Sequence, residues 1–332
     1  MTGRERIRRT LACEPIGGRV PHWELEYYLT MEKLGRVHPM HRKYSQWNQM
    51  SLTERRLHIE DMADVYISFA RLFEHSAIHV NVTPWSLENL QLILERIREK
   101  TGDEFFLAVY SDPTWAIPDG KSMMDFSVQM IEEPEALNEI SRRRVEQEVN
   151  KAAFLDKNGH LADGFLMGSD YCFNTNPFFS PDRFEELIVP YLKEVIAEFH
   201  KLGFYAIKHT DGNVIPILRQ IADCGPDAIH SLDPQGGVSL SEARRIVGEN
   251  ICLMGNVNCG LLQTGTDEEC DADVMRALRE GMANGRGYIF STSNCVYTGL
   301  PPERYDRMWR LWKQYGIYGT QPESSHGEVH GF

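Results

Sequence analysis

The sequence has no excess of positive charge and no long hydrophobic run. Its 35 lysine and arginine residues are outnumbered by 48 aspartate and glutamate residues, which gives a formal net charge of −13. Phosphate binding needs a basic face, so we expect no nucleic-acid partner. No apolar stretch approaches the ~18 residues that a membrane-spanning helix needs, so we expect no membrane partner either.

The chain also lacks the marks of a secreted protein. Its opening residues, MTGRERIRRT, predict a charged amphipathic helix rather than the apolar core of a signal peptide. We therefore expect a cytoplasmic protein whose seven cysteines are reduced thiols. A glycine-rich phosphate-binding turn after the first predicted strand is absent too, which disfavours an open dinucleotide-binding sheet.

Short apolar segments alternate with helical segments along most of the chain. Eight of them predict buried strands, at residues 20–26, 76–82, 105–111, 164–170, 203–210, 227–233, 251–257 and 287–293. Eight β/α units in succession favour a single (β/α)8 TIM barrel within the α/β class. We expect one domain over residues 1–318, with an N-terminal helical extension at the barrel bottom, a helical lid inserted at about 27–75, and a polar C-terminal tail at 319–332.

Several helix boundaries are marked by capping residues. Thr2 and Ser86 each precede a predicted helix, and Ser180 is followed by a proline and an acid in the first turn of the next helix. Pro190 is expected to kink that helix. A final helix is predicted over residues 302–315.

Polar side chains gather where the predicted strands end. The active site of such barrels lies at the carboxyl ends of the strands. The residues at these ends are Glu24, Glu26, Asn81, Asp112, Asp170, His209, Asp211, Asp233, Asn256, Cys259 and Cys295. Five of them also have a structural alternative: Asp211 and Asp233 as helix caps, His209 as a core histidine, and the two cysteines as packing residues.

Three of these residues have the composition of a catalytic zinc site. His209, Asp211 and Cys295 offer nitrogen, oxygen and sulfur ligands and would leave a coordination position for a substrate. Cys259 or Asp233 would supply an extra ligand if one is needed. A substrate heteroatom on zinc would be stabilised as a leaving group.

These residues also carry a family resemblance. The segments SPDRFEELIVPYLKEVIAEFHKLGFYAIKHTDGN, MGNVNCGLLQTGTDEE and GYIFSTSNCVYTGLPPERY, together with the opening RERIRRTLACEPIGGRVP, resemble the uroporphyrinogen decarboxylase superfamily. True decarboxylases of this superfamily bind a tetrapyrrole with an arginine-containing segment after the first strand. Here that segment is HWELEYYLTMEK, in which Glu24 and Glu26 would repel a substrate rich in carboxylates.

The resemblance is nearer to the other branch, the corrinoid-dependent methyltransferases. It implies a zinc held by a His-x-Cys pair and by a later cysteine near the eighth strand. His209 and Cys295 match the first and last of these positions, whereas Asp211 stands where many members have cysteine. That difference predicts a harder, less thiophilic ligand set.

The leading hypothesis is therefore a zinc-dependent methyltransferase that moves a methyl group from a small donor, such as an aryl methyl ether, to the cobalt of a corrinoid on a partner protein. Glu24, Glu26 or Asp170 would protonate the leaving group. The residues expected to bind the substrate are Trp23, Tyr27, Tyr28, Asp112 and Asn256. A metal-free decarboxylase and a non-catalytic binding barrel are the alternatives, and a homo-oligomer is possible.

Overall fold

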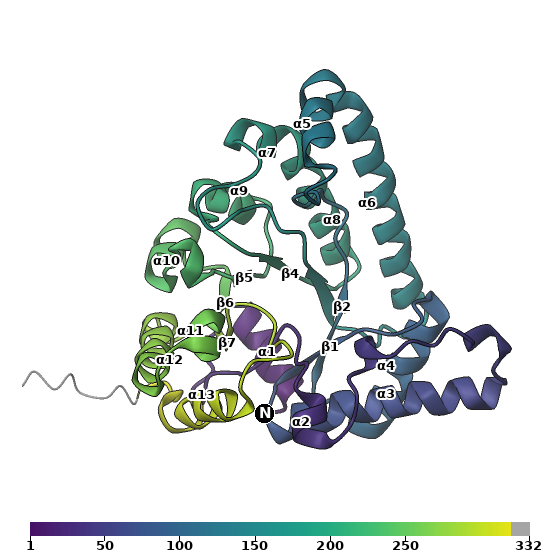
Figure 1. The fold of residues 1–332 in the computed structure, drawn as a ribbon, viewed down its shortest axis with the longest axis vertical. Helices are drawn as coiled ribbons and strands as arrows, with labels where there is room; N and C mark the ends of the chain where they lie inside the picture. Colours follow the sequence, from purple (N-terminus) through teal and green to yellow (C-terminus); the bar gives the residue numbers. More distant parts are fainter. Residues whose placement is uncertain (320–332) are drawn as a thin grey trace, which may run out of the picture.

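Seven parallel strands form one curled sheet in which each strand pairs with the next along the chain (Figure 1). The computed structural model describes residues 1–319. Its strands are β1 (Ala77–Val80), β2 (Phe106–Tyr110), β3 (Gly164–Met167), β4 (Tyr205–Thr210), β5 (Ala228–Ser231), β6 (Cys252–Val257) and β7 (Tyr288–Thr292). Because all seven run in the same direction, their carboxyl ends lie on one rim.

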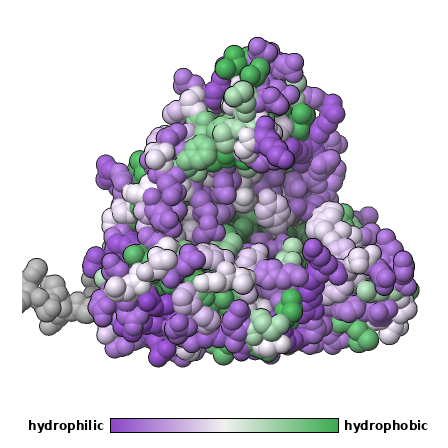
Figure 2. Space-filling view, in the orientation of Figure 1, coloured by the Kyte–Doolittle hydropathy of each residue, from purple (hydrophilic) through white to green (hydrophobic). Residues whose placement is uncertain are grey.

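Helices connect the strands and cover the outer face of the sheet (Figure 1). They are α1 (Gly3–Leu11), α2 (Thr30–Leu34), α3 (Leu52–Leu72), α4 (Leu87–Thr101), α5 (Met123–Glu132), α6 (Pro134–Lys157), α7 (Pro181–Leu187), α8 (Val189–Lys201), α9 (Leu218–Asp223), α10 (Leu240–Val247), α11 (Cys259–Thr264), α12 (Asp267–Met282) and α13 (Pro302–Tyr315). Figure 2 shows that the viewed face is mostly hydrophilic, with hydrophobic residues in separate patches.

The concave face of the sheet encloses its own hydrophobic cluster. Every strand contributes at least one buried residue to it, and α1 contributes Ile7 and Leu11. Helix α1 packs against β1, β2 and β7, and Arg4 N donates to the carbonyl of Glu104, which precedes β2. The amphipathic helix predicted at the start of the chain therefore lies at the amino ends of the strands, opposite the rim.

The first predicted strand, residues 20–26, is an extended segment without a regular ladder. Its His22 forms an isolated parallel bridge to Phe290 of β7, and the carbonyl of His22 accepts from Ser76 N, just before β1. The segment thus bonds to residues at both edges of the sheet. Seven strands are assigned within residues 1–319, so the closed eight-stranded barrel stays a prediction.

The capping residues mark the helix ends as expected. The side chains of Thr2, Ser86 and Ser180 accept hydrogen bonds from the first turns of α1, α4 and α7. The helix that contains Pro190 is interrupted at Ile188, which separates α7 from α8 and places the proline in the first turn of α8. The predicted final helix is confirmed as α13.

The region 27–75 is only partly helical. It contains α2, two short 3₁₀ turns and α3, and α3 packs against α4 and β1. A lid function for this region stays a prediction. The predicted tail lies outside the described residues apart from Gly319. Within the described part of the chain, the helices are too short or too polar to cross a bilayer.

Candidate functional site

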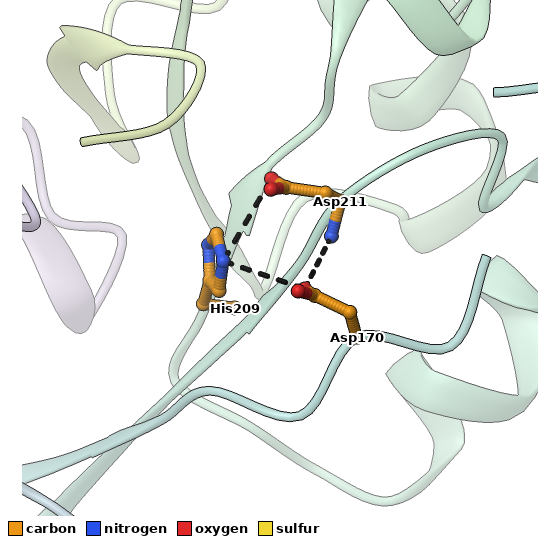
Figure 3. Close-up of side chains that lie close together, drawn as sticks. All are labelled: Asp170, His209 and Asp211. Carbon is orange, nitrogen blue, oxygen red and sulfur yellow. Dashed lines mark hydrogen bonds and ion pairs between the residues drawn. The ribbon is translucent and has the colours of Figure 1, made fainter. Parts of the chain in front are cut away.

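Three side chains from neighbouring strand ends converge on the rim (Figure 3). His209 is in the carboxyl half of β4, Asp211 follows that strand directly, and Asp170 lies three residues beyond β3. His209 Nε2 is 3.6 Å from Asp170 Oδ1 and 3.7 Å from Asp211 Oδ1. One ligand atom from each residue lies within 4.8 Å of the others, so the three can hold a metal ion.

The hydrogen bonds behind His209 fix which of its nitrogens bears the proton. His230 Nε2 is 3.0 Å from the carbonyl oxygen of Thr292, and since a carbonyl only accepts, this nitrogen carries a hydrogen. Burial lowers the pKa of His230 to about 3, so its Nδ1 is unprotonated and accepts. His209 Nδ1, 2.8 Å away, must then donate to it. The Nε2 of His209 is left with its lone pair directed toward Asp170 and Asp211.

The electrostatics of this cluster favour a bound proton or metal ion. Burial raises the pKa of Asp211 to about 8, and the nearby charge of Asp170 adds to the shift. Burial lowers the pKa of His209 to about 3, so the ring supplies no positive charge of its own. A lone pair that faces two carboxylates is repelled by them unless a metal ion or a proton lies between.

Asp211 does not cap a helix. Its Oδ1 accepts from Ser231 Oγ at 2.7 Å, its Oδ2 accepts from Asn294 Nδ2, and its backbone N–H donates to Asp170 Oδ1 at 3.0 Å. These bonds hold the carboxylate beside His209. Asp233, by contrast, caps a 3₁₀ turn by accepting from Gln235 N, which is the structural alternative considered for it.

Cys295 is outside the three-residue group found among the described residues. Its backbone N–H donates to Asn294 Oδ1, so Asn294 connects Asp211 to Cys295. Burial, with the charges of Glu26 and Asp211, raises the pKa of the Cys295 thiol well above its ordinary value. The structure therefore groups Asp170, and not Cys295, with His209 and Asp211. The ligand role of Cys295 and the proton-transfer role of Asp170 stay predictions.

Cys259 is a buried residue at the start of α11. Burial and the charge of Glu24 raise its pKa to about 12. Its Sγ lies 3.9 Å from the carbonyl oxygen of Cys295, so the thiol packs beneath the Cys295 backbone. A buried neutral thiol in this position fits the packing alternative better than a ligand role.

Glu24 is buried and saturated with hydrogen bonds. Its carboxylate accepts from the backbone and hydroxyl of Thr292 and from Ser291 Oγ, and it contacts His22 and Tyr305. Burial alone would raise its pKa, but the bonds from His22 and Thr292 outweigh burial and lower it. Glu24 therefore joins the segment 20–26 to β7 as a fixed anion and is poorly suited to proton transfer.

Glu26 forms a pair with His79 of β1. His79 Nδ1 lies 3.0 Å from Glu26 Oε1 and 3.1 Å from the carbonyl oxygen of Leu25, so this nitrogen carries the hydrogen. Asn81 Nδ2 donates to the same carboxylate oxygen at 2.6 Å. His79 Nε2 is buried and has no hydrogen-bond partner among the described residues. The pair therefore resembles an oriented base with a free lone pair.

Asp112 forms a buried ion pair with Lys208, the residue before His209. Their side chains are fully buried, and Lys208 Nζ lies 2.8 Å from Asp112 Oδ2. Ser169 N donates to the same oxygen, and Thr114 donates to the other. Asp112 thus links Ser169, which precedes Asp170, to Lys208, which precedes His209. It therefore helps to fix the positions of Asp170 and His209.

The other residues predicted to bind substrate lie in different environments. Trp23 is fully buried and packs on Phe106, the first residue of β2, near the amino ends of the strands. Tyr27 is buried against Phe69, Phe73 and Tyr305. Asn256 is buried and donates to the Leu232 carbonyl while accepting from Arg276. Tyr28 is half-buried and stacks on His41.

Sequence reasoning missed His79 and His230. His79 lies two residues beyond Ala77, and His230 lies two residues beyond Ala228, just as His209 lies two residues beyond Ile207. Ala77, Ala228 and Ile207 all belong to the hydrophobic cluster on the concave face of the sheet. Because side chains alternate along a strand, all three imidazoles face the same interior. The repeated pattern Ala-Ile-His in β1 and β5 was the signal that would have revealed them.

Part of the chain is similar in sequence to uroporphyrinogen decarboxylases. Two curated relatives are the uroporphyrinogen decarboxylases of Trichodesmium erythraeum, 28% identical over 137 residues, and Chlorobium luteolum, 30% identical over 132 residues. The matches cover 41% and 37% of this chain, but only 37% and 35% of those proteins. The chain thus matches little more than a third of the length of these relatives.

A solved structure, a methyltransferase from Methanosarcina mazei, has the same fold with a TM-score of 0.73 and 18% sequence identity. The likeness covers 95% of this chain and 99% of that one. The family model for uroporphyrinogen decarboxylase (URO-D) matches residues 123–315, more than half of the 332 residues, and this stretch contains Asp170, His209 and Asp211. The chain belongs to the uroporphyrinogen decarboxylase (URO-D) family.

Proposed function

We propose that this protein is a zinc-dependent methyltransferase that moves a methyl group from a small donor, such as an aryl methyl ether, to the cobalt of a corrinoid on a partner protein. The observation that carries the proposal is the unprotonated His209 Nε2, which faces the carboxylates of Asp170 and Asp211. The methyltransferase name of the Methanosarcina mazei protein, whose fold this chain shares, adds support.

His209, Asp170 and Asp211 would hold the zinc. One imidazole nitrogen and two carboxylates form a hard ligand set that suits zinc and other divalent transition metals. When bound there, zinc would act as a Lewis acid on the heteroatom that carries the methyl group. Cys295, joined to Asp211 through Asn294, is the candidate for a further ligand.

Proton handling is assigned to Glu26 and His79. The Nδ1–H of His79 donates to the Leu25 carbonyl and lies beside the Glu26 carboxylate, so its Nε2 can exchange a proton with a group in the interior. Asn81 holds the Glu26 carboxylate in place. Glu24 is less suited to this role because its oxygens are occupied by hydrogen-bond partners. The formal charge of −13 would favour a partner protein with a positive docking face.

The proposal is tested with zinc-loaded protein, methoxybenzene or a substituted analogue, and free cob(I)alamin as the methyl acceptor. Formation of methylcobalamin is followed by absorbance. We expect transfer by the wild type, loss after treatment with a chelator, and recovery on addition of zinc. Full activity of metal-free protein, or of His209→Ala, would contradict the zinc role.

A metal-free decarboxylase is the second candidate, favoured by the names of the curated relatives. It predicts release of carbon dioxide from a pyrrole carboxylate by protein without bound metal. The acidic residues of the segment 20–26 argue against a decarboxylase. Glu24 is held as an anion by its hydrogen-bond donors, and it would repel a substrate rich in carboxylates. Carbon dioxide release from uroporphyrinogen by chelator-treated protein would favour this candidate over the methyltransferase.

A further inference from the structure

A pocket opens on the rim beside the cluster of Asp170, His209 and Asp211. It has a volume of about 490 Å³ and lies between the loop after β2 and the helices α5 and α6. Its lining includes Tyr110, Trp115, Ile117, Phe126, Arg144 and Ser169. This volume is in the range of sites for small molecules.

The pocket directly adjoins the candidate metal ligands. Ser169 immediately precedes Asp170 in the chain, and Ile117 N donates to the backbone carbonyl of Asp170 at 2.8 Å. Tyr110 is the last residue of β2, and its ring packs against Gly168, just past the end of β3. A molecule in this pocket would therefore lie next to the backbone that positions Asp170.

Arg144 gives the pocket a cation without a fixed counter-ion. Within the described part of the chain its guanidinium makes no hydrogen bond or ion pair, and it lies 3.9 Å from the centre of the Trp115 ring. Burial lowers the pKa of Arg144, so the charge is partly desolvated. Asp112 cannot neutralise it fully, because Lys208 already pairs with that carboxylate. Asp125 also lines the pocket but is exposed to solvent.

Aromatic rings form part of the lining, and one of them carries a free donor. Trp115 and Phe126 pack with their ring centres 5.0 Å apart. Trp115 Nε1 is buried and has no hydrogen-bond partner among the described residues. A guanidinium stacked on an indole still presents its N–H edge, and that edge matches the two oxygens of a carboxylate. The flat apolar walls fit an aromatic ring.

We propose that this pocket binds the carboxylate end of a small aromatic acid, with Arg144 as the charge partner and Trp115 as ring support and N–H donor. The inference rests on the proposed function in one respect, because it takes this acid to be the methyl donor. The donor would then be a methoxylated aromatic carboxylate. A single arginine and a single indole N–H favour a carboxylate over a phosphate, which generally recruits more donors.

The experiment compares benzoate with benzyl alcohol, its neutral analogue, by calorimetry on the full chain. We expect the wild type to bind benzoate more tightly than benzyl alcohol. Arg144→Gln should weaken benzoate binding at least about tenfold and leave benzyl alcohol binding unchanged, because only the charged bond is lost. Trp115→Phe should weaken benzoate binding by a few-fold while keeping an aromatic wall.

Arg143→Gln is the matched control, since Arg143 is on the same helix, is exposed and pairs with Glu139. It should bind benzoate like the wild type. Equal affinity of the wild type for the two ligands, or wild-type benzoate affinity in Arg144→Gln, would overturn the proposal. Repeating the benzoate titration in the His209→Ala background separates this inference from the proposed function. If benzoate binding in that background still depends on Arg144, and the zinc-loaded wild type transfers no methyl group, only the proposed reaction is refuted.

Discussion

The Nδ1 atoms of His209 and His230 lie 2.8 Å apart, and the Thr292 carbonyl at the far side of His230 determines which ring donates. The donor is His209, so its other nitrogen faces Asp170 and Asp211 as a lone pair. A metal-ligating histidine commonly has such a partner on its second nitrogen. Here the partner is a second imidazole from the neighbouring strand.

Replacement of this partner tests its role. His230→Phe removes the acceptor for His209 Nδ1–H, so His209 can change tautomer or rotate. We expect zinc affinity to fall by about 10–100-fold, measured by competition with a chromophoric chelator. His200→Phe, at an exposed histidine that pairs with Asp227, should not change it. Equal zinc affinity in the wild type and His230→Phe would refute the tautomer argument.

The ligand set can be tested by comparing two variants. Asp170→Asn should reduce the stoichiometry of bound zinc, because Asp170 is in the three-residue group, whereas Cys295→Ser should retain more of it. Metal content of the purified proteins is measured by mass spectrometry. Asp223→Asn, at an exposed aspartate, is the control. Loss of zinc only in Cys295→Ser would restore the ligand set inferred from sequence.

The buried pair of Asp112 and Lys208 predicts a large effect on stability. Lys208→Met leaves the Asp112 carboxylate buried without its counter-ion, so we expect the free energy of unfolding to fall by about 3–5 kcal/mol. The double variant Asp112→Asn, Lys208→Met should recover part of this loss. Urea denaturation followed by circular dichroism measures both changes. Additive losses in the double variant would contradict coupling of the pair.

His38 predicts a pH dependence of stability. Burial, aided by His41 and Arg42, lowers its pKa from the usual 6.5 to about 3. Between these values the unfolded chain binds more protons than the folded chain, so the free energy of unfolding falls as the pH falls. The contribution is at most about 1.4 kcal/mol per pH unit.

The test of this contribution is His38→Asn, which retains an acceptor for Met40 N but does not titrate. Denaturant midpoints of the variant and the wild type are compared at pH 7 and pH 5. The wild type should lose more stability over this interval than the variant. An identical decrease in both proteins would show that His38 is not the titrating group.

Local sequence was sufficient for most of the secondary structure. Seven of the eight predicted strands are present, because their apolar residues are short runs flanked by turn and capping residues. The segment 20–26 differs because it carries Glu24 and His22, whose side chains bond to each other and to distant residues. A pattern of local apolarity does not report such long-range bonds.

The sequence by itself determined the α/β class, the order of the strands and the candidate rim on which His209 and Asp211 lie, because capping, hydrophobic period and parallel β/α succession are local properties. Only the tertiary structure decided that Asp170 joins these two residues, that Cys295 lies outside their group, and that His230 sets the tautomer of His209. Those relationships depend on distances between residues from different strands, and such distances are set by sheet curvature and side-chain packing.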